Sequence, residues 1–464
     1  MLAPNDKTNN LSNAWKILAL TNLAVFAASL DATVLFVAFP SIQNTFSGVS
    51  PAQLSWVLNA YTVFYAALLV PAGRLADRIG RRKVFLSGVA TFTLASVLCG
   101  IAPSPELLIA ARSFQAIGGA MLTPASLALI LTAFPKNKRA TAVTIWGAVG
   151  GLAAAIGPSL GGVIVQTCGW RWAFFLNLPI GVIAIIFGSR LLFESRDLNA
   201  KDIPDVIGVM LSIAGVGLAA LGIVQSNEWG WNDNRTIITI VVGIALLILF
   251  LYRSTQVKSP AFDLKLFHDP NYRFANLATL VFGMSFNAMF FGLILFLTKV
   301  WGYSTLAAGL AITPGPLMVA FVTPFAGRIA DSRGHRVLIV PGGIIFAMGA
   351  LLLYTQAQVT PSFFAIWLPS AILIGIGVGL LLSILSSAAV HSIPPNQFAV
   401  GSAINQAIRQ IGSVLGIAIV IALLGRPSPT ELLNAFDRIF AFLIAGGLLT
   451  SLIGINIKTQ SKEV

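Results

Sequence analysis

The chain has 464 residues, of which 56% are hydrophobic and only 10% are Asp, Glu, Lys or Arg. Soluble proteins carry about 25% charged residues, so this composition excludes a soluble fold. The net charge of +13 would suit a nucleic-acid-binding protein, but the basic residues stand in short clusters between apolar runs, not on one face or in a tail. We therefore expect no nucleic-acid partner.

Long apolar runs follow one another along the whole chain. A helix that crosses a membrane needs about 20 mostly apolar residues, and fourteen runs meet that length. The seventh and eighth are the weakest, and without them the count would fall to twelve. The predicted spans of this all-α membrane protein are residues 15–40, 52–72, 84–103, 106–131, 140–166, 172–192, 203–225, 234–254, 272–298, 304–326, 337–356, 362–390, 399–424 and 434–456.

The basic residues predict the orientation of these spans. With the N-terminus in the cytoplasm, 22 of the 29 Lys and Arg residues fall on the inner side and five on the outer side. This asymmetry follows the positive-inside rule. We therefore predict a multi-pass protein of the cell membrane with both termini in the cytoplasm, and the anionic inner leaflet of the lipid bilayer as a partner.

One sequence motif is repeated. GRLADRIGRRK at 73–83 recurs as GRIADSRGHRV at 327–337, with six of eleven positions identical, and each copy follows the second span of a group of six. Such a pattern indicates a duplicated transporter with an inserted helix pair. The predicted parts are a cytoplasmic N-terminus (1–14), a first six-helix bundle (15–192), a linker with two further transmembrane helices (193–271), a second six-helix bundle (272–456) and a cytoplasmic tail (457–464).

Three ionisable residues lie deep in the predicted spans: Asp31, Arg112 and Arg409. A charged side chain in hydrocarbon is costly and usually faces a cavity where it has a function. Asp31 either carries a proton or binds a substrate cation, or it only joins helices through hydrogen bonds. Arg112 lies at a similar depth, so an ion pair with Asp31 is feasible, whether functional or a static salt bridge. Arg409 either faces the inner vestibule or contacts a negative or dipolar group of the substrate.

Four segments resemble one family, the major facilitator superfamily, and within it the fourteen-helix drug:proton antiporter branch. They are LDATVLFVAFPSI at 30–42, the loop motif at 73–83, IGPSLGG at 156–162 and WRWAFFLNLPIG at 170–181. The sequence departs from the family pattern at Phe36, where the pattern has Asn, and at Ala153, which replaces a Gly. The resemblance implies a major facilitator fold of two six-helix bundles with a two-helix central insert.

The resemblance also implies roles for particular residues. Asp31 and Arg112 would couple transport to protons; for Arg112 the matching segment is ARSFQAIGGA at 111–120, where Ala116 replaces a Gly of the family motif. The repeated loop would latch the two halves, although plain retention of positive charge inside is the alternative. The fifth span would seal the path against leak, or be only a packing groove. The latch residues are Gly73, Arg74, Asp77, Arg78, Gly80, Arg81, Arg82 and Asp331, and the antiporter-motif residues are Gly157, Pro158, Gly161 and Gly162.

The ninth span carries a Met- and Phe-rich stretch, FGMSFNAMFFG at 282–292. Adaptable Met and aromatic walls suit varied apolar ligands, although such stripes also face lipid or the core. The candidate pocket residues are Tyr61, Gln115, Phe286, Asn287, Phe290, Asn405, Gln406 and Arg409.

These features together predict a proton-coupled antiporter that exports amphiphilic or cationic small molecules by alternating access, as in multidrug efflux. No nucleotide-binding loop or catalytic motif is found in the sequence, so we expect no enzyme, cofactor or metal, a proton gradient as the driving force, and a monomer. One alternative is a dedicated exporter of a single metabolite or organic anion. A non-transporting receptor or scaffold would not need the repeated loop together with a buried acid.

Overall fold

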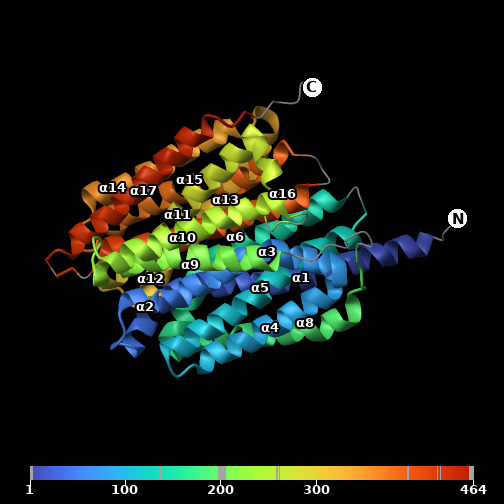
Figure 1. The fold of residues 1–464 in the computed structure, drawn as a ribbon, viewed down its shortest axis with the longest axis horizontal. Helices are drawn as coiled ribbons and strands as arrows, with labels where there is room; N and C mark the ends of the chain where they lie inside the picture. The colour runs from blue at the N-terminus through green and yellow to red at the C-terminus, as the bar shows by residue number, and fades with distance from the viewer. Residues whose placement is uncertain are drawn as a thin grey trace.

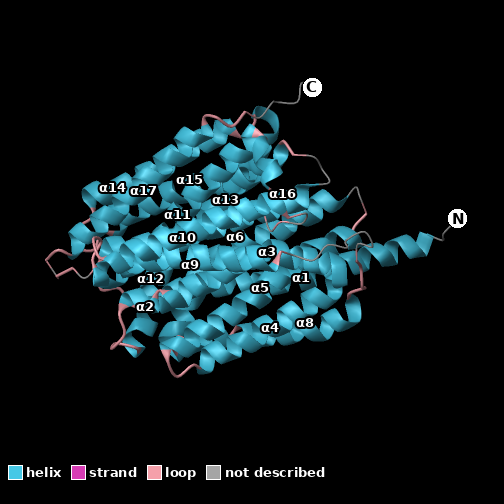
Figure 2. Cartoon of the chain, viewed as in Figure 1, coloured by secondary structure: helices cyan, strands magenta, loops and turns pink. Residues whose placement is uncertain are grey.

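The computed structural model describes residues 4–135, 138–196, 205–257, 260, 262–393, 397–425, 427–428 and 430–458. Within these ranges every regular element is a helix (Figure 2). Fourteen helical segments are long and apolar enough to cross a membrane, and each overlaps one predicted span. The prediction of a fourteen-helix membrane protein is therefore confirmed.

The first six spans form a bundle, called the first bundle below. Two of its spans are broken: α2 and α3 together make the second, and α7 and α8 make the sixth. Helix starts follow capping rules, since Ser104 accepts a hydrogen bond from the Leu107 N–H and is followed by Pro105. The elements are α1 (Pro4–Thr45), α2 (Pro51–Leu54), α3 (Trp56–Ile79), α4 (Arg81–Ile101), α5 (Pro105–Ala133), α6 (Arg139–Cys168), α7 (Arg171–Phe175) and α8 (Asn177–Leu191).

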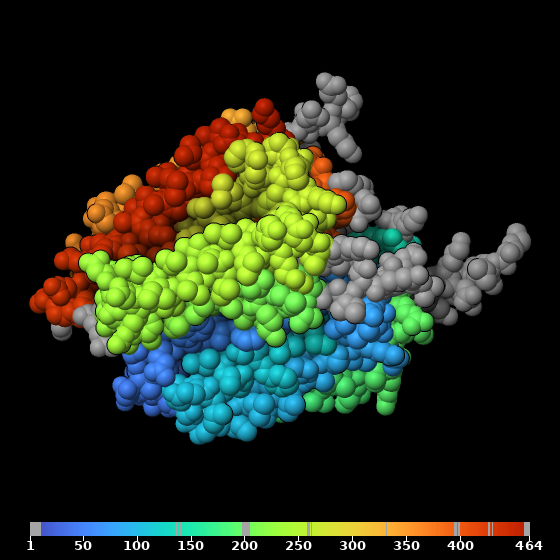
Figure 3. All heavy atoms as spheres, in the orientation of Figure 1, coloured from blue at the N-terminus to red at the C-terminus, as the bar shows by residue number. Residues whose placement is uncertain are grey.

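The insert consists of α9 (Val206–Trp229) and α10 (Asn234–Gln256), which pack against each other. Asp205 caps α9 and pairs with Arg253 of α10 at 2.9 Å. At the other end of α9, Asn227 Nδ2 donates to two carbonyls of the second bundle, including that of Ala422 at 2.8 Å. The insert crosses the front of the molecule between the bundles, in green and yellow-green (Figure 3).

The last six spans form the second bundle. The short 3₁₀ helix η2 (Leu264–His268) leads into it, and Asp269 with Pro270 starts its first long helix in the same way as Ser104 with Pro105. Its elements are α11 (Pro270–Lys299), α12 (Thr305–Ile312), α13 (Pro314–Arg333), α14 (Arg336–Gln356), the π-helix η3 (Phe363–Trp367), α15 (Leu368–His391), α16 (Phe398–Leu424) and α17 (Leu432–Gly454).

The two bundles lie side by side with their helices running roughly along the long axis (Figure 1). Both ends of the chain lie at the same end of the molecule, as an even number of crossings requires. We call this the terminal end and the opposite one the far end. Several helices extend beyond the apolar runs that predicted them, because backbone hydrogen bonding continues where the hydrocarbon-facing sequence stops; α1 extends over Pro4–Thr45, against a predicted span of 15–40.

The bundles touch through aromatic rings in the far-end half of the molecule. Phe36 of α1 stacks on Phe290 of α11 with ring centroids 6.1 Å apart, and Phe39 meets Phe291 edge to face at 4.9 Å. Phe39 and Phe291 are fully buried. The departure from the family pattern at Phe36 therefore lies in a contact between the bundles.

Candidate functional site

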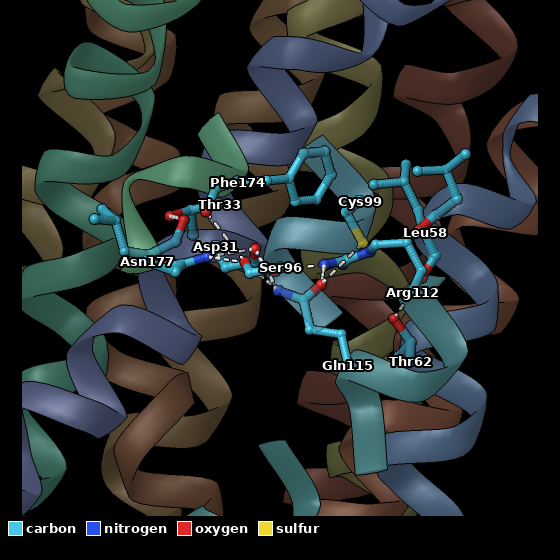
Figure 4. A network of polar contacts seen from close by, with 12 residues as sticks. Asp31, Thr33, Leu58, Thr62, Ser96, Cys99, Arg112, Gln115, Phe174 and Asn177 are labelled. Carbon is cyan, nitrogen blue, oxygen red and sulfur yellow. Dashed lines mark hydrogen bonds and ion pairs between the residues drawn. The ribbon is translucent and has the colours of Figure 1, made fainter. Parts of the chain in front are cut away.

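Asp31 lies inside the first bundle and accepts three hydrogen bonds (Figure 4). Its Oδ2 is 2.5 Å from Nη1 of Arg112, in an ion pair whose side chains are 1% and 2% exposed. Its Oδ1 accepts from Nε2 of Gln115 and from Nδ2 of Asn177, each at 3.0 Å. The carboxylate is therefore held by one cation and two amides in a site closed to solvent.

Ser96 of α4 forms the second layer of this network. Its Oγ accepts from Gln115 Nε2 at 2.9 Å and from Asn177 Nδ2 at 2.8 Å, and it donates to the carbonyl of Phe174 at 3.2 Å. Buried polar groups need such partners, because an unpaired one costs free energy. The network thus draws α1, α4, α5 and α8 of one bundle around Asp31.

Arg112 has partners besides Asp31. Its Nη1 also donates to Gln115 Oε1 at 2.5 Å, and its Nε donates to the Val57 carbonyl of α3 at 3.1 Å. The guanidinium lies 4.3 Å from the ring centroid of Tyr61, a cation–π distance. A loss of charge on Asp31 would therefore leave the guanidinium with three of its contacts.

Two tyrosines extend from Arg112 toward the second bundle. The rings of Tyr61 and Tyr65 on α3 stack with centroids 5.7 Å apart and planes at 12°. Tyr65 donates to Thr123 Oγ1 at 3.1 Å, and its helix α3 packs on α16 of the second bundle. Gly119 leaves room for the Tyr61 hydroxyl, since a Cβ there would lie 2.7 Å from it. A chain of contacts thus joins Asp31 to the interface between the bundles.

A small pocket of about 40 Å³ lies between α6 of the first bundle and α11, α12, α13, η3 and α15 of the second. Phe286 and Phe290, both predicted pocket residues, line it together with Met289. Trp367 also lines it, with its indole N–H donated to the Ala311 carbonyl at 2.8 Å. The pocket surface consists almost entirely of carbon.

The other six predicted pocket residues do not line this pocket, and their side chains contact other parts of the protein. Asn405 donates to Asn276 Oδ1 and Thr279 Oγ1, both at 3.0 Å, inside the second bundle. Asn287 donates to the Gly283 carbonyl of its own helix. The remaining four are Tyr61 and Gln115, which belong to the Asp31 network, and Gln406 and Arg409, which bond to each other.

The loop motif forms its described contacts within the first bundle. Asp77 pairs with Arg81 at 2.8 Å, and Arg82 Nη2 donates to the Ser189 carbonyl at 2.6 Å. Glu194 accepts from the Arg82 N–H at 3.1 Å, so a carboxylate caps α4. Gly80 has φ 124°, a conformation that favours glycine.

The other predicted latch residues lie on α3 and α13. Gly73 packs against Pro124 of α5, since a Cβ added to Gly73 would lie 3.4 Å from the Pro124 Cβ. Arg74 and Arg78 lie in the last turns of α3. Asp331 lies in α13, and its side chain is outside the described part of the structure.

The antiporter-motif residues of α6 divide between two neighbours. Gly157 and Gly161 face Thr33 and Val34 of α1, so they pack the first bundle. Gly162 instead faces the backbone of α12 in the second bundle, as does the Pro158 carbonyl, which contacts Gly309. A hydrogen bond between the hydroxyls of Ser159 and Thr313, and one from the Leu306 N–H to Gln166 Oε1, join α6 to α12 and its C-terminal cap. The motif therefore lies at the junction of the bundles in the far-end half.

Sequence reasoning did not single out several site residues. Asn177 left a signal, as an amide in the apolar sixth span, and Glu194 is the first acid after that span. Ser96 left none, because small hydroxyl residues are common in membrane helices. Trp367 and Met289 stand among many apolar residues and differ from them only by position.

The sequence profile of the Major Facilitator Superfamily matches residues 21–417. Similar proteins include the cephamycin export protein CmcT of Amycolatopsis lactamdurans, 35% identical over 96% of this chain and 94% of the relative. The multidrug resistance protein Stp of Mycobacterium tuberculosis is 34% identical over 88% and 76%, and the multidrug transporter protein MdtP of Bacillus subtilis 31% over 88% and 74%.

The solved structures include one with the same fold. It is a bacterial homologue of the human drug peptide transporters PepT1 and PepT2, with TM-score 0.64 and 14% identity over 96% of this chain and 97% of that one. The profile match covers most of the chain, and the relatives exceed 30% identity over most of their length. The chain therefore belongs to the Major Facilitator Superfamily.

Proposed function

We propose that the chain is a proton-coupled antiporter that exports amphiphilic small molecules across the cell membrane, with its terminal end in the cytoplasm. Relatives named as export and multidrug resistance proteins support the export direction. The observation that carries the proposal is the carboxylate of Asp31, buried with its own set of donors in the middle of the first bundle.

The contacts of Asp31 suit a group that alternates between two charge states. An ionised carboxylate, which only accepts hydrogen bonds, would use all three donors around it. Protonation would remove the charge that balances Arg112. The guanidinium would keep Gln115, the Val57 carbonyl and the Tyr61 ring, so both states of the site have hydrogen-bonded arrangements.

Coupling to transport needs a path out of the first bundle. The donors to Asp31 all belong to that bundle, so a rigid rotation of the bundles against each other would leave them unchanged. Contacts run from Arg112 to Tyr61 and Tyr65 of α3, the helix that packs on α16 of the second bundle. We infer that a change at the ion pair reaches the interface through these two rings.

Alternating access would use the junction in the far-end half. The aromatic contacts of Phe36 and Phe39 and the packing of Gly162 on α12 close that side of the interface. These contacts would part when the bundles rock to the outward-facing state. The loop motif would latch the terminal side in that state.

Replacement of Asp31 by Asn tests the proposal. In proteoliposomes with an imposed pH gradient, we expect Asp31→Asn to insert normally but to lose proton-driven export. Asp437→Asn, which neutralises a partly buried acid of α17, should export normally and serves as the control. Normal export by the Asp31 variant would exclude this residue as the proton carrier.

A second candidate function is export of one compound class. It is favoured by the relative named as a cephamycin export protein, which matches over 96% of this chain. A panel of chemically unrelated compounds separates the two candidates. A multidrug exporter will transport several unrelated members, whereas a dedicated exporter will transport one related group.

A further inference from the structure

Asn177 uses only part of the hydrogen-bonding capacity of its side chain. Its Nδ2 donates to Asp31 Oδ1 at 3.0 Å and to Ser96 Oγ at 2.8 Å, so both amide hydrogens have acceptors (Figure 4). Its Oδ1 is buried and has no hydrogen-bond partner among the described residues. An unpaired buried acceptor costs free energy, and in a folded protein it calls for an explanation.

The charge of Asp31 explains why the amide of Asn177 has this orientation. An ionised carboxylate only accepts hydrogen bonds, whereas an asparagine amide has its donor nitrogen and its acceptor oxygen on opposite sides of one planar group. The amide therefore turns its NH₂ group toward an ionised Asp31, and its oxygen has to point away. An uncharged Asp31 would not impose this orientation.

Protonation would reverse what the carboxyl group of Asp31 needs. A proton on Oδ1 would face the N–H groups of Gln115 and Asn177, and a proton on Oδ2 would face the guanidinium of Arg112, which has only donors. The amide oxygen of Gln115 already accepts from Arg112 Nη1 at 2.5 Å and from Cys99 Sγ at 3.8 Å. Of the three described donors to Asp31, only Asn177 therefore has an unused acceptor.

We propose that Asn177 is the positioning residue for proton exchange, because its amide turns to accept a hydrogen bond from Asp31 when Asp31 is protonated. The proton comes from the aqueous side and stays on Oδ1 of Asp31. A half-turn about the Cβ–Cγ bond of Asn177 breaks the N–H bonds to Asp31 and Ser96 and forms one O–H···O bond between Asp31 and Asn177. The inference rests on the proposed function and adds the group that receives the hydrogen bond of the protonated state.

The sixth span is interrupted at the place where this turn occurs. Asn177 is the first residue of α8, directly after the interruption that separates it from α7. Ser96 holds both sides, since its hydroxyl donates to the Phe174 carbonyl of α7 at 3.2 Å while its oxygen accepts from Asn177. The turn of the amide releases the α8 side and leaves the α7 side attached. Protonation thus changes a contact between two segments of this span.

The network around Asp31 contains three other ionisable side chains, Arg112 of α5, Tyr61 of α3 and Cys99 of α4. Arg171 of α7 donates outside the network, and α6 and α8, which also pack on α1, carry ionisable residues only near their ends. A guanidinium keeps its charge in proteins, and tyrosine and cysteine ordinarily ionise at alkaline pH. Of these groups, Asp31 is therefore the one whose charge the amide follows.

Infrared difference spectroscopy between acidic and alkaline pH detects both changes in the purified full-length protein in detergent. Protonation of Asp31 adds a carboxyl C=O band. The amide C=O band of Asn177 should move to lower frequency at acidic pH, because its oxygen gains a hydrogen bond. Labelling with ¹³C-asparagine identifies amide bands, and the band that is lost in Asn177→Leu belongs to this residue; Asn177→Thr serves the same assignment if the Leu variant does not fold. In Asp31→Asn the Asn177 band should not respond to pH.

The two bands separate failure of this inference from failure of the proposed function. A carboxyl band from Asp31 without movement of the Asn177 band would overturn the inference and leave proton exchange at Asp31 intact. An Asn177 band that already has its low frequency at alkaline pH would mean that a bound water uses the oxygen, and it would also overturn the inference. If no carboxyl band of Asp31 appears over the pH range in which the protein stays folded, both fail.

A second test changes Ser96, which holds the amide in its present orientation. In Ser96→Ala the turn of Asn177 no longer breaks a bond, so protonation of Asp31 becomes easier. The pH at which half of the carboxyl band has appeared should therefore rise, and the loss of one hydrogen bond corresponds to about half a unit to one unit. The bond from Gln115 to Ser96 is lost in both charge states and does not move this midpoint.

Ser113→Ala is the matched control for this substitution. The Ser113 hydroxyl donates to the Ile109 carbonyl of its own helix at 3.1 Å, so the variant should keep the midpoint of the wild-type protein. A folded Ser96→Ala protein whose midpoint is unchanged or lower would overturn the inference. Thermal unfolding of each variant is measured in parallel, and a loss of stability without a higher midpoint would leave Ser96 with a packing role alone.

Discussion

The ion pair inside the first bundle makes a prediction about stability that depends on both partners. We consider Asp31→Asn, Arg112→Gln and the double variant. Removing one member of a buried ion pair costs about 3–5 kcal/mol, because the other charge is left uncompensated, whereas removing both can be close to neutral. Both side chains are nearly inaccessible to solvent, so the full effect applies.

The remaining contacts predict which single variant loses more stability. Asp31→Asn leaves Arg112 bonded to Gln115 and Val57 and stacked on Tyr61, so we expect a loss near 3 kcal/mol. Arg112→Gln leaves a buried carboxylate with two amide donors and no cation, so we expect a loss near 5 kcal/mol. The double variant should be more stable than Arg112→Gln alone.

Unfolding in detergent with increasing sodium dodecyl sulfate, followed by fluorescence of the nine tryptophans, measures these differences. The pair between Asp77 and Arg81 provides a control, because its side chains are 41% and 20% exposed. The same substitutions there should cost about 0–1 kcal/mol. The reasoning is refuted if Arg112→Gln costs no more than Arg81→Gln, or if the double variant is the least stable of the three.

Four further substitutions test the rest of the account. Tyr61→Leu removes the ring under Arg112, worth about 0.5–2 kcal/mol, and should slow proton-coupled export several-fold, whereas Tyr61→Phe should not; equal rates would remove this ring from the coupling path. Gly162→Ala places a Cβ 3.0 Å from the Thr305 carbonyl oxygen, and such overpacking destabilises a contact by about 1–3 kcal/mol. The closed junction between the bundles should therefore open more often, and an impermeant maleimide should label a cysteine at position 313 faster. Asp77→Asn should lower kcat and leave KM unchanged, and the opposite pattern would argue against a latch. Arg409 bonds to Gln406 on its own helix, so Arg409→Ala should affect anionic and cationic substrates equally in a transport panel; a selective effect on anions would place it in the substrate site.

The sequence was sufficient to predict the fourteen helices, because hydropathy and length are properties of each segment by itself. It also placed Asp31 and Arg112 at similar depth in their spans, which the helical rise alone determines. The partners Ser96 and Asn177 could not be predicted, since they depend on how each helix is rotated about its axis. Hydropathy gives depth but not rotation.

The residues that line the pocket could not be predicted from the sequence either. Polar residues in spans were taken as candidate contacts, but membrane helices use such side chains to bond to one another, as Asn405 does with Asn276 and Thr279. The pocket walls are apolar residues in a chain that is 56% hydrophobic. Only the packing of α6 against the second bundle distinguishes Ala154 and Met289 from residues that face lipid.

Proton release on substrate binding tests the central claim most directly. The purified protein is placed in weakly buffered detergent solution with a pH-sensitive dye, and a compound identified as transported is added. If Asp31 is the group that exchanges protons with substrate, the wild-type protein will change its proton uptake or release on addition, and Asp31→Asn will show no change while still binding the compound. An equal proton signal from the folded Asp31→Asn protein would contradict the account.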